Sequence, residues 1–291
     1  MATNHLSVIF FSYLCMKFYY NVMDVKKVLF ISQEIYPYLP ESPIANVGRY
    51  LPQGIQEKGI EVRAFMPKYG AINDRTKQLH EVIRLSGRNI VINDSDHPLI
   101  IKVATLSQAR MQIYFIYNDD YFTHNVTKEL ETTTSPEDND ERSIFFVRGV
   151  MDTVKKFGWD PDIIHCHGWI TALTPLYVKH MYSEDPIFEN SKVVYSLYDD
   201  EFTMPFDEKL AEKMVMDGII PEDVAPIQGK PVDYVALTKL AIAHSKGVIQ
   251  HSPNVKPEII EYIKELGIPF LPYQEDESDY VDRYAEFYKS I

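Results

Sequence analysis

Two histidines and a tryptophan follow a short apolar run in the middle of the chain, within residues 160–173 (Asp-Pro-Asp-Ile-Ile-His-Cys-His-Gly-Trp-Ile-Thr-Ala-Leu). The apolar pair predicts a buried parallel strand, and His165, His167 and Trp169 come where that strand ends. Alternation along an extended backbone places both histidines on one side and Cys166 on the other. Because ligands of open α/β sheets bind outside the carboxyl ends of the strands, we expect a binding crevice at this point of the chain.

Three interpretations of the histidine pair stay open at this stage. A His-x-His pair can bind a metal, but no third ligand with suitable spacing lies nearby and the chain has 2 cysteines, so we expect no metal site. A crevice that binds a sugar or a phosphate is the interpretation we favour. The remaining alternative is a pair of hydrogen-bonded core histidines at the end of a strand.

The order of the predicted elements indicates an α/β fold. Strand and helix patterns alternate along most of the chain, which predicts a Rossmann-like doubly wound parallel sheet. Turn residues and alternating polarity in residues 73–107 predict hairpins instead. The expected strands cover residues 26–32, 61–66, 111–117, 163–167, 192–197 and 247–250, and the expected helices 43–58, 141–156, 170–181, 232–244, 255–266 and 279–291. Residues 131–140 read as an acidic loop.

Composition narrows the class of protein. The 291 residues are 45% hydrophobic and 24% charged, which is typical of a globular chain with a sizeable core. A formal net charge of −13 argues against nucleic acid or an anionic membrane as a partner. Two cysteines are too few for a disulfide framework, so we expect a reducing, cytoplasmic compartment. Residues 1–22 lack the flanks of a signal peptide, and we expect them to be a start-site extension upstream of Met23.

The segment that contains the histidine pair resembles the Asp-Val-Val-His-Ala-His-Asp-Trp-His-Ala-Gly-Leu motif of bacterial glycogen synthases and plant starch synthases. These glycosyltransferases extend an α-1,4-glucan from ADP-glucose. The run Asn-Asp-Glu-Arg-Ser-Ile-Phe-Phe-Val-Arg at residues 139–148 is similar to their Asn-Ala-Glu-Arg-Phe-x-Phe-Phe-x-Arg run, and Gly-Trp-x-Pro-Asp follows in both. The resemblance covers residues 24–266 and corresponds to the amino-terminal half of such enzymes. It implies the amino-terminal domain of a GT-B fold, in which two Rossmann-like domains face each other across a cleft.

The resemblance also implies a set of substrate contacts. Glu34 stands at the glutamate of the family's Ser-Glu-x-x-Pro motif, and Tyr198 falls on the first residue of a His-Asn pair. No catalytic residue is assigned beyond the family-like His167, and no cofactor is implied. The ligand implied is an α-glucan or a sugar nucleotide. The expected substrate-binding residues are Glu34, His165, His167, Trp169, Tyr198 and Lys239.

This chain departs most from the family's pattern in the donor-binding loop. Its Lys-Thr-Gly-Gly-Leu sequence aligns without a gap with Pro40, Glu41, Ser42, Pro43 and Ile44. A proline replaces the lysine that meets the diphosphate, and an acid is added beside it. Ser42 and Pro43 replace the two glycines that let a ligand approach bare backbone, and they also suit the N-cap and first residue of a helix. We therefore expect a degenerate donor loop.

From these observations we expect a domain at residues 23–274 and a C-terminal crossing helix within residues 275–291. That helix is expected to begin after Ser278 as its N-cap and to pack near the first helix of the domain. By resemblance the activity is glucosyl transfer from ADP-glucose to glucan, impaired because the second half of the enzyme is absent. The alternative is a non-catalytic carbohydrate-binding or regulatory partner of glycogen metabolism. A separate chain that completes the cleft is the expected partner.

Overall fold

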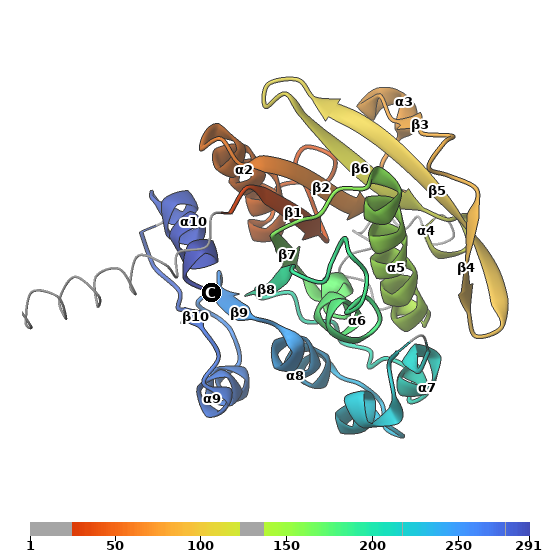
Figure 1. Cartoon of the computed structure of the whole chain (residues 1–291), viewed down its shortest axis with the longest axis vertical. Coiled ribbons are helices and arrows are strands. Elements are labelled where there is room, and N and C mark those ends of the chain that lie inside the picture. Colours follow the sequence, from red (N-terminus) through yellow and green to blue (C-terminus); the bar gives the residue numbers. More distant parts are fainter. Residues whose placement is uncertain (1–24, 123–136, 217, 277) are drawn as a thin grey trace, which may run out of the picture.

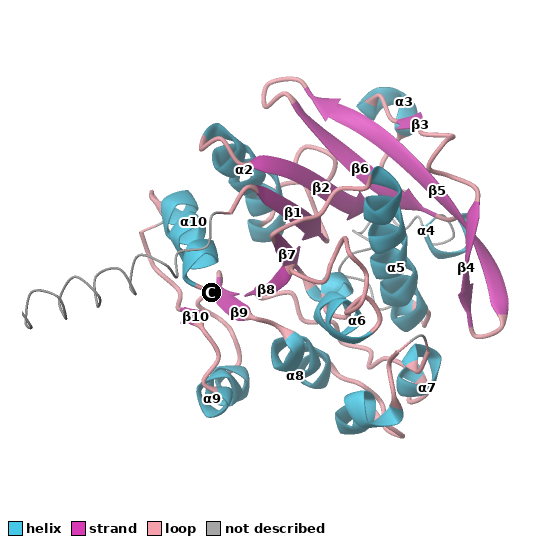
Figure 2. Cartoon of the chain, viewed as in Figure 1, coloured by secondary structure: helices cyan, strands magenta, loops and turns pink. Residues whose placement is uncertain are grey.

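The computed structural model describes residues 25–122, 137–216, 218–276 and 278–291, and it shows a sheet with helices on both faces (Figures 1 and 2). The predicted extension, residues 1–22, and most of the predicted acidic loop lie outside the described residues. None of the helices in these four ranges is long and apolar enough to cross a membrane.

Strands and helices alternate along much of the chain. The strands are β1 Lys27–Ser32, β2 Glu61–Pro67, β3 His80–Glu81, β4 Arg88–Ile92, β5 Ser95–Leu106, β6 Met111–Tyr117, β7 Ile163–His167, β8 Lys192–Leu197, β9 Gly247–Gln250 and β10 Phe270–Leu271. The helices are α2 Pro43–Glu57, α3 Asp74–Lys77, α4 Asp119–Phe122, α5 Asn139–Phe157, α6 Thr174–His180, α7 Leu210–Met214, α8 Tyr234–His244, α9 Pro257–Leu266 and α10 Tyr280–Ser290. Two 3₁₀ segments, η1 Trp169–Thr171 and η2 Pro221–Ile227, lie between them.

The sheet is parallel over most of its width. Its strand order is β10-β9-β8-β7-β1-β2-β6-β5-β3, and β4 pairs with β5. All pairs from β10 to β6 are parallel, whereas β5 pairs antiparallel with β6, β3 and β4. The predicted doubly wound parallel sheet and the predicted hairpins are therefore confirmed. In the β4–β5 turn Asn93 and Asp94 both have positive φ, as this kind of tight hairpin requires.

β1 lies at the centre of this sheet because its sequence is a continuous apolar run. Its residues from Val28 to Ile31 are fully buried, as expected for a strand covered by helices on both faces. In Figure 1, α2 and α10 cover one face of the sheet, and α5, α6, α8 and α9 lie on the other. Helices on both sides explain why this part of the strand carries no charged side chain on either face.

The first helix begins where the sequence predicts. The hydroxyl of Ser42 accepts a hydrogen bond from the backbone N–H of Ala45, and Pro43 occupies the first turn. Gly48 lets this helix approach the chain that leaves β1, because a Cβ there would lie 2.5 Å from the carbonyl oxygen of Glu34. Local capping and one close contact thus fix α2 against the carboxyl end of β1.

Several elements differ from the sequence prediction. The helix expected at residues 170–181 is divided into η1 and α6, because Gly168 enters the segment with φ of 88° and Pro175 lacks the N–H that a continuous helix would use. The short α7, η2 and β10 carry too little periodicity to be predicted. Ser278 is not the N-cap of the last helix: Asp279 is, and its side chain makes no capping hydrogen bond.

The last helix packs on the same face as the first. Val281 of α10 lies against Gly54 of α2, where a Cβ would come within 2.7 Å of it. Phe287 lies over Gly247 of β9, where a Cβ would come within 2.8 Å of the ring. Tyr288 is fully buried, and its hydroxyl is hydrogen-bonded to His165 of β7. Helix α10 therefore covers the part of the sheet formed by β7 and β9.

Substitution of Gly54 tests this packing. Alanine is normally favoured over glycine inside a helix by about 1 kcal/mol. In α2 we expect Gly54→Ala to lower the free energy of unfolding by about 1–3 kcal/mol, because the new methyl group overlaps Val281. Urea denaturation of Gly54→Ala and of Gly54→Ala/Val281→Ala measures the effect, and the double variant is expected to recover most of the loss. A stabilised Gly54→Ala protein would show that α10 does not sit on α2.

Candidate functional site

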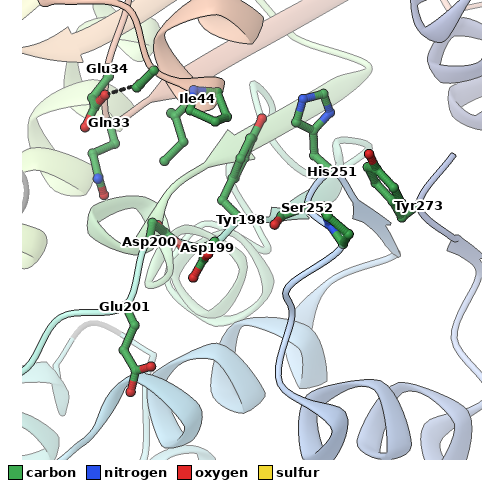
Figure 3. A pocket seen from close by; sticks show the side chains of 13 residues that line it. Gln33, Glu34, Ile44, Tyr198, Asp199, Asp200, Glu201, His251, Ser252 and Tyr273 are labelled. Atoms are coloured by element: carbon green, nitrogen blue, oxygen red, sulfur yellow. Dashed lines mark hydrogen bonds between the residues drawn. The ribbon is translucent and has the colours of Figure 1, made fainter. Parts of the chain in front are cut away.

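A pocket of about 360 Å³ opens at the carboxyl ends of β1, β8 and β9 (Figure 3). That volume is within the range of small-molecule sites. The residues that line it come from the loops after β1, β8, β9 and β10 and from the start of α2. They are Gln33, Glu34, Ser42, Pro43, Ile44, Tyr198, Asp199, Asp200, Glu201, His251, Ser252, Pro253 and Tyr273.

The topology of the sheet explains why the pocket is at this edge. β1 pairs with β2 on one side and with β7 on the other, so the chain winds outward from β1 in two directions. Loops that leave the carboxyl ends on the two sides of such a switch point diverge and leave a crevice between them. Gln33 and Glu34 leave β1 at that point, and residues 198–201 leave β8 on the β7 side.

The lining of the pocket is acidic. Glu34, Asp199, Asp200 and Glu201 supply four carboxyl groups, and among the described residues no lysine or arginine lines it. Lys256 is not part of the lining, but its Nζ lies 2.5 Å from the Glu201 carboxylate. A ligand in this pocket therefore meets hydrogen-bond acceptors with negative charge rather than cations.

Asp200 is the most constrained of these carboxyl groups. Its Oδ1 accepts a hydrogen bond of 2.8 Å from the hydroxyl of Tyr234, and its Oδ2 accepts one of 2.8 Å from the backbone N–H of Trp169. Burial raises the pKa of Asp200 to about 6, although the two hydrogen bonds oppose that shift. Asp200 thus ties the end of β8 to η1 and carries a proton part of the time near neutral pH.

His165 is a core histidine in this structure. It is fully buried, and both ring nitrogens have partners: Nε2 lies 2.7 Å from the Ser196 hydroxyl and Nδ1 lies 2.6 Å from the Tyr288 hydroxyl. Burial lowers its pKa well below the usual value, so the ring is neutral. The third interpretation of the histidine pair, a hydrogen-bonded core residue, therefore describes its packing.

His167 lies beneath the pocket, not in its wall. It is fully buried, and its Nδ1 lies 2.8 Å from the hydroxyl of Tyr198, which does line the pocket. Its Nε2 is buried without a hydrogen-bond partner. Among the described residues no group of three or more His, Cys, Asp or Glu side chains is placed to hold a metal ion.

Trp169 and Lys239 do not line the pocket. The indole ring of Trp169 is 2% exposed and packs edge-on against Phe202 and Phe206, at centroid distances of 5.5 and 5.7 Å. Lys239 extends over the ring of Tyr262, 5.4 Å from its centroid, in a separate hollow between α8 and α9. Of the expected substrate contacts, the pocket brings together Glu34 and Tyr198. The role of all six residues as substrate contacts stays a prediction.

The expected donor loop forms the capped start of α2. Pro40 and Glu41 are exposed and do not line the pocket, whereas Ser42 and Pro43 do. A helix N-terminus can bind an anion through its free N–H groups. In α2, however, Pro43 has no N–H, and the N–H of Ala45 is already bonded to Ser42. The Ser42 hydroxyl in turn donates to the Glu34 carboxylate (Figure 3), so little donor capacity remains for a phosphate.

Sequence reasoning missed Asp200 and Glu201 after β8 as site residues, did not count Asp199 among the substrate contacts, and missed His251 after β9, although Ser252 and Pro253 match family positions. Asp199, Asp200 and Glu201 come directly after a predicted strand, so the carboxyl-end rule that selected the histidine pair would also have found them. His251 directly follows the predicted strand 247–250 and could have been found by the same rule. Tyr273 carries no such signal, because the two-residue strand β10 before it is too short to be predicted.

Comparisons with known proteins agree with this architecture. The sequence profile of the family described as the starch synthase catalytic domain matches residues 27–268. Similar curated proteins include the glycogen synthase of Pelodictyon phaeoclathratiforme, 32% identical over 235 residues, and that of Chlorobium limicola, 35% identical over 235 residues. Each of these alignments covers 80% of this chain and 47% of the relative. The chain thus spans about half the length of the curated relatives it matches.

A solved structure shares the fold. The catalytic domain of starch synthase IV from Arabidopsis thaliana, bound to ADP and acarbose, superposes with a TM-score of 0.67 at 18% sequence identity. The match covers 86% of this chain and 51% of the other. That neighbour supports a GT-B type of fold for the sheet and its helices.

The pH dependence of stability tests the environment of Asp200. Its pKa is about 6 in the folded chain and 3.8 for the free side chain, so between these values the folded chain holds a proton that the unfolded chain has released. The resulting stabilisation is full below about pH 4 and is lost as the pH rises through 6, a loss on the order of 2–3 kcal/mol. We expect Asp200→Asn to abolish this loss in urea denaturation at pH 4 to 7.

The comparison must be between the two proteins, because buried histidines whose pKa is lowered change stability in the opposite direction over the same interval. Parallel stability curves for the wild type and Asp200→Asn would contradict a raised pKa.

Proposed function

The chain belongs to the starch synthase catalytic domain family, and from that premise we propose that its pocket binds the uncharged end of an α-glucan rather than a sugar nucleotide. The observation that carries the proposal is the charge of the pocket: four carboxyl groups line it, and no described lysine or arginine does. Glucose units are neutral and present hydroxyl groups. These hydroxyls donate charge-assisted hydrogen bonds to carboxylate oxygens.

A diphosphate, unlike a glucose unit, has charge of the same sign as the carboxylates of the pocket. Its negative charges would lie beside Glu34 and Asp199 at short range, where like charges repel strongly. The start of α2, which could offset this repulsion, has its Ala45 N–H bonded to Ser42 and a proline at the first position. Both features support selection of an uncharged carbohydrate.

The aromatic residues of the lining also suit a sugar. Tyr273 and His251 line the pocket, and aromatic rings with polar tips give a sugar both an apolar face and hydrogen-bonding groups. We place the protein in the cytoplasm as part of the proposal, because a buried free thiol, Cys166, suits a reducing compartment.

Glucosyl transfer from ADP-glucose is the second candidate, and family membership favours it. Transfer requires cationic or N–H groups that stabilise the departing diphosphate in a closed site. Among the described residues no cationic lysine or arginine side chain lines the pocket. We therefore propose that this chain acts in transfer only when another domain or chain supplies those groups, and otherwise serves as a carbohydrate-binding partner in glycogen metabolism.

Ligand titration tests the binding proposal. We expect maltotriose to raise the melting temperature of the purified protein and ADP-glucose to leave it unchanged at the same concentration. In isothermal titration, Asp199→Asn is expected to weaken maltotriose binding about fivefold to tenfold, because one charged acceptor of the pocket is lost. Glu265→Gln, on the exposed side of α9, is the matched control and should bind as the wild type does. Stabilisation by ADP-glucose and not by maltotriose would refute the proposal.

A transfer assay tests the second candidate. The purified chain alone is expected to incorporate no labelled glucose from ADP-glucose into glycogen above a blank without protein. Steady incorporation that disappears in Asp200→Asn would overturn this expectation and make the chain a complete enzyme.

A further inference from the structure

Tyr198 separates the pocket from a buried imidazole. Its side chain is 2% exposed, yet it lines the pocket, and its hydroxyl lies 2.8 Å from Nδ1 of His167. In Figure 3 the ring stands between Ile44 and His251 in the middle of the lining residues. The Tyr198 and His251 rings lie 5.2 Å apart, centroid to centroid. The phenol therefore lies between the pocket lining and the buried His167.

Two buried polar atoms at the carboxyl ends of β1 and β7 have no hydrogen-bond partner. The Nε2 atom of His167 and the hydroxyl of Ser32 are both buried and make no hydrogen bond. The two residues are paired in the β1–β7 register, so their side chains are on the same face of the sheet as Tyr198. Buried polar atoms in folded proteins almost always have partners, and exceptions often mark a function. The fold thus holds more hydrogen-bonding capacity under Tyr198 than it uses.

His165 shows that an unpaired ring nitrogen is not a general property of the histidines of β7. It is two residues earlier on the same face, and both of its ring nitrogens are hydrogen-bonded to Ser196 and Tyr288. His167, in contrast, is hydrogen-bonded through Nδ1 to Tyr198 and leaves Nε2 unpaired. Both ring nitrogens of His165 are thus satisfied within the fold, whereas the hydrogen bond of the His167 ring goes to the Tyr198 phenol.

The chemistry of this imidazole selects a ligand class. Burial lowers the pKa of His167 to about 3, so the ring is neutral at physiological pH. A neutral imidazole has one donor and one acceptor nitrogen, and a hydroxyl group can both donate and accept. A sugar hydroxyl matches such a ring, whereas a phosphate would need donors alone.

We propose that Tyr198 is a specificity-determining gate, whose phenol fills an inner subsite for a sugar hydroxyl above His167 and confines the glucan to the outer pocket. The inference rests on the proposed function and names a determinant within the same site. Removal of the phenol joins the inner subsite to the pocket, and the imidazole exchanges the tyrosine hydroxyl for a hydroxyl of the sugar.

Titration with maltotriose tests the gate. We expect Tyr198→Ala to bind maltotriose about fivefold more tightly than the wild type, the usual value of one added hydrogen bond. We expect the added substitution His167→Ala to remove that gain. The matched control is Tyr195→Ala, because Tyr195 is on the same strand and also 2% exposed, but pairs in register with Cys166 on the opposite face. This control loosens β8 without opening a route to His167, so its affinity should equal that of the wild type.

A second variant covers the case in which Tyr198→Ala does not fold. Tyr198→Val removes the ring and leaves a small β-branched side chain that suits an extended backbone, and circular dichroism melting shows which variants are folded. In the folded gate variant the ¹⁵N signals of the His167 ring should shift when maltotriose is added, and in the wild type they should not. The gate is refuted if no folded variant gains affinity, if the gain survives His167→Ala, or if Tyr195→Ala gains as much.

The experiment separates this inference from the proposed function. The wild-type titration alone decides whether the outer pocket binds glucan. If the wild type does not bind maltotriose but a Tyr198 variant binds it through His167, the gate stands and the proposed function fails. If the wild type binds and no variant gains, the proposed function stands and the gate fails.

Discussion

Parallel hydrogen bonding between β1 and β7 is the constraint on which the rest of the site depends. The two strands join halves of the chain that are more than 130 residues apart, and their register aligns Ser32 with His167. The backbone N–H of Gln33 continues that pairing with a bond of 2.9 Å to the carbonyl of His167. Everything that leaves the sheet at this edge, from Glu34 on one side to Asp200 on the other, is placed by this one junction. A shift of one residue would turn the side chains of either strand to the other face.

The electrostatics of the pocket follow from how its donors are used. The start of α2 points at the pocket, but Ser42 accepts from one of its N–H groups and donates to Glu34. Asp200 receives its hydrogen bonds from Tyr234 and from the backbone of η1. The donors at the start of α2 are thus engaged within the protein, and no described lysine or arginine lines the cavity. The same folding pattern that supports anion sites in other α/β proteins leaves an excess of acceptors in this one.

Sequence patterns predicted the sheet well because its strands are long apolar runs and its hairpins have turn residues of the required kind. They predicted less of the site because burial is a property of three dimensions. Nothing local to His165 shows that Tyr288, 123 residues away, will bond to it, and nothing local to Lys239 shows that α9 will place a tyrosine ring beneath it. The position of Asp200 directly after a strand can be read from the sequence. Its raised pKa cannot, because it comes from burial in the folded chain. The break between η1 and α6 could not be predicted either, because it depends on the positive φ of Gly168.

The packing of α10 has a consequence for the order of folding. Its residues follow all ten strands of the described part of the chain, and synthesis proceeds at about 5–20 residues per second. Until α10 docks, the strands β7 and β9 lack the aromatic cover of Phe287 and Tyr288. During that interval an apolar face with a bare glycine, Gly247, is exposed to solvent and to other nascent chains. Helix α10 therefore covers this apolar face only after the strands beneath it have been synthesised, and slow docking of the helix leaves the face open to aggregation.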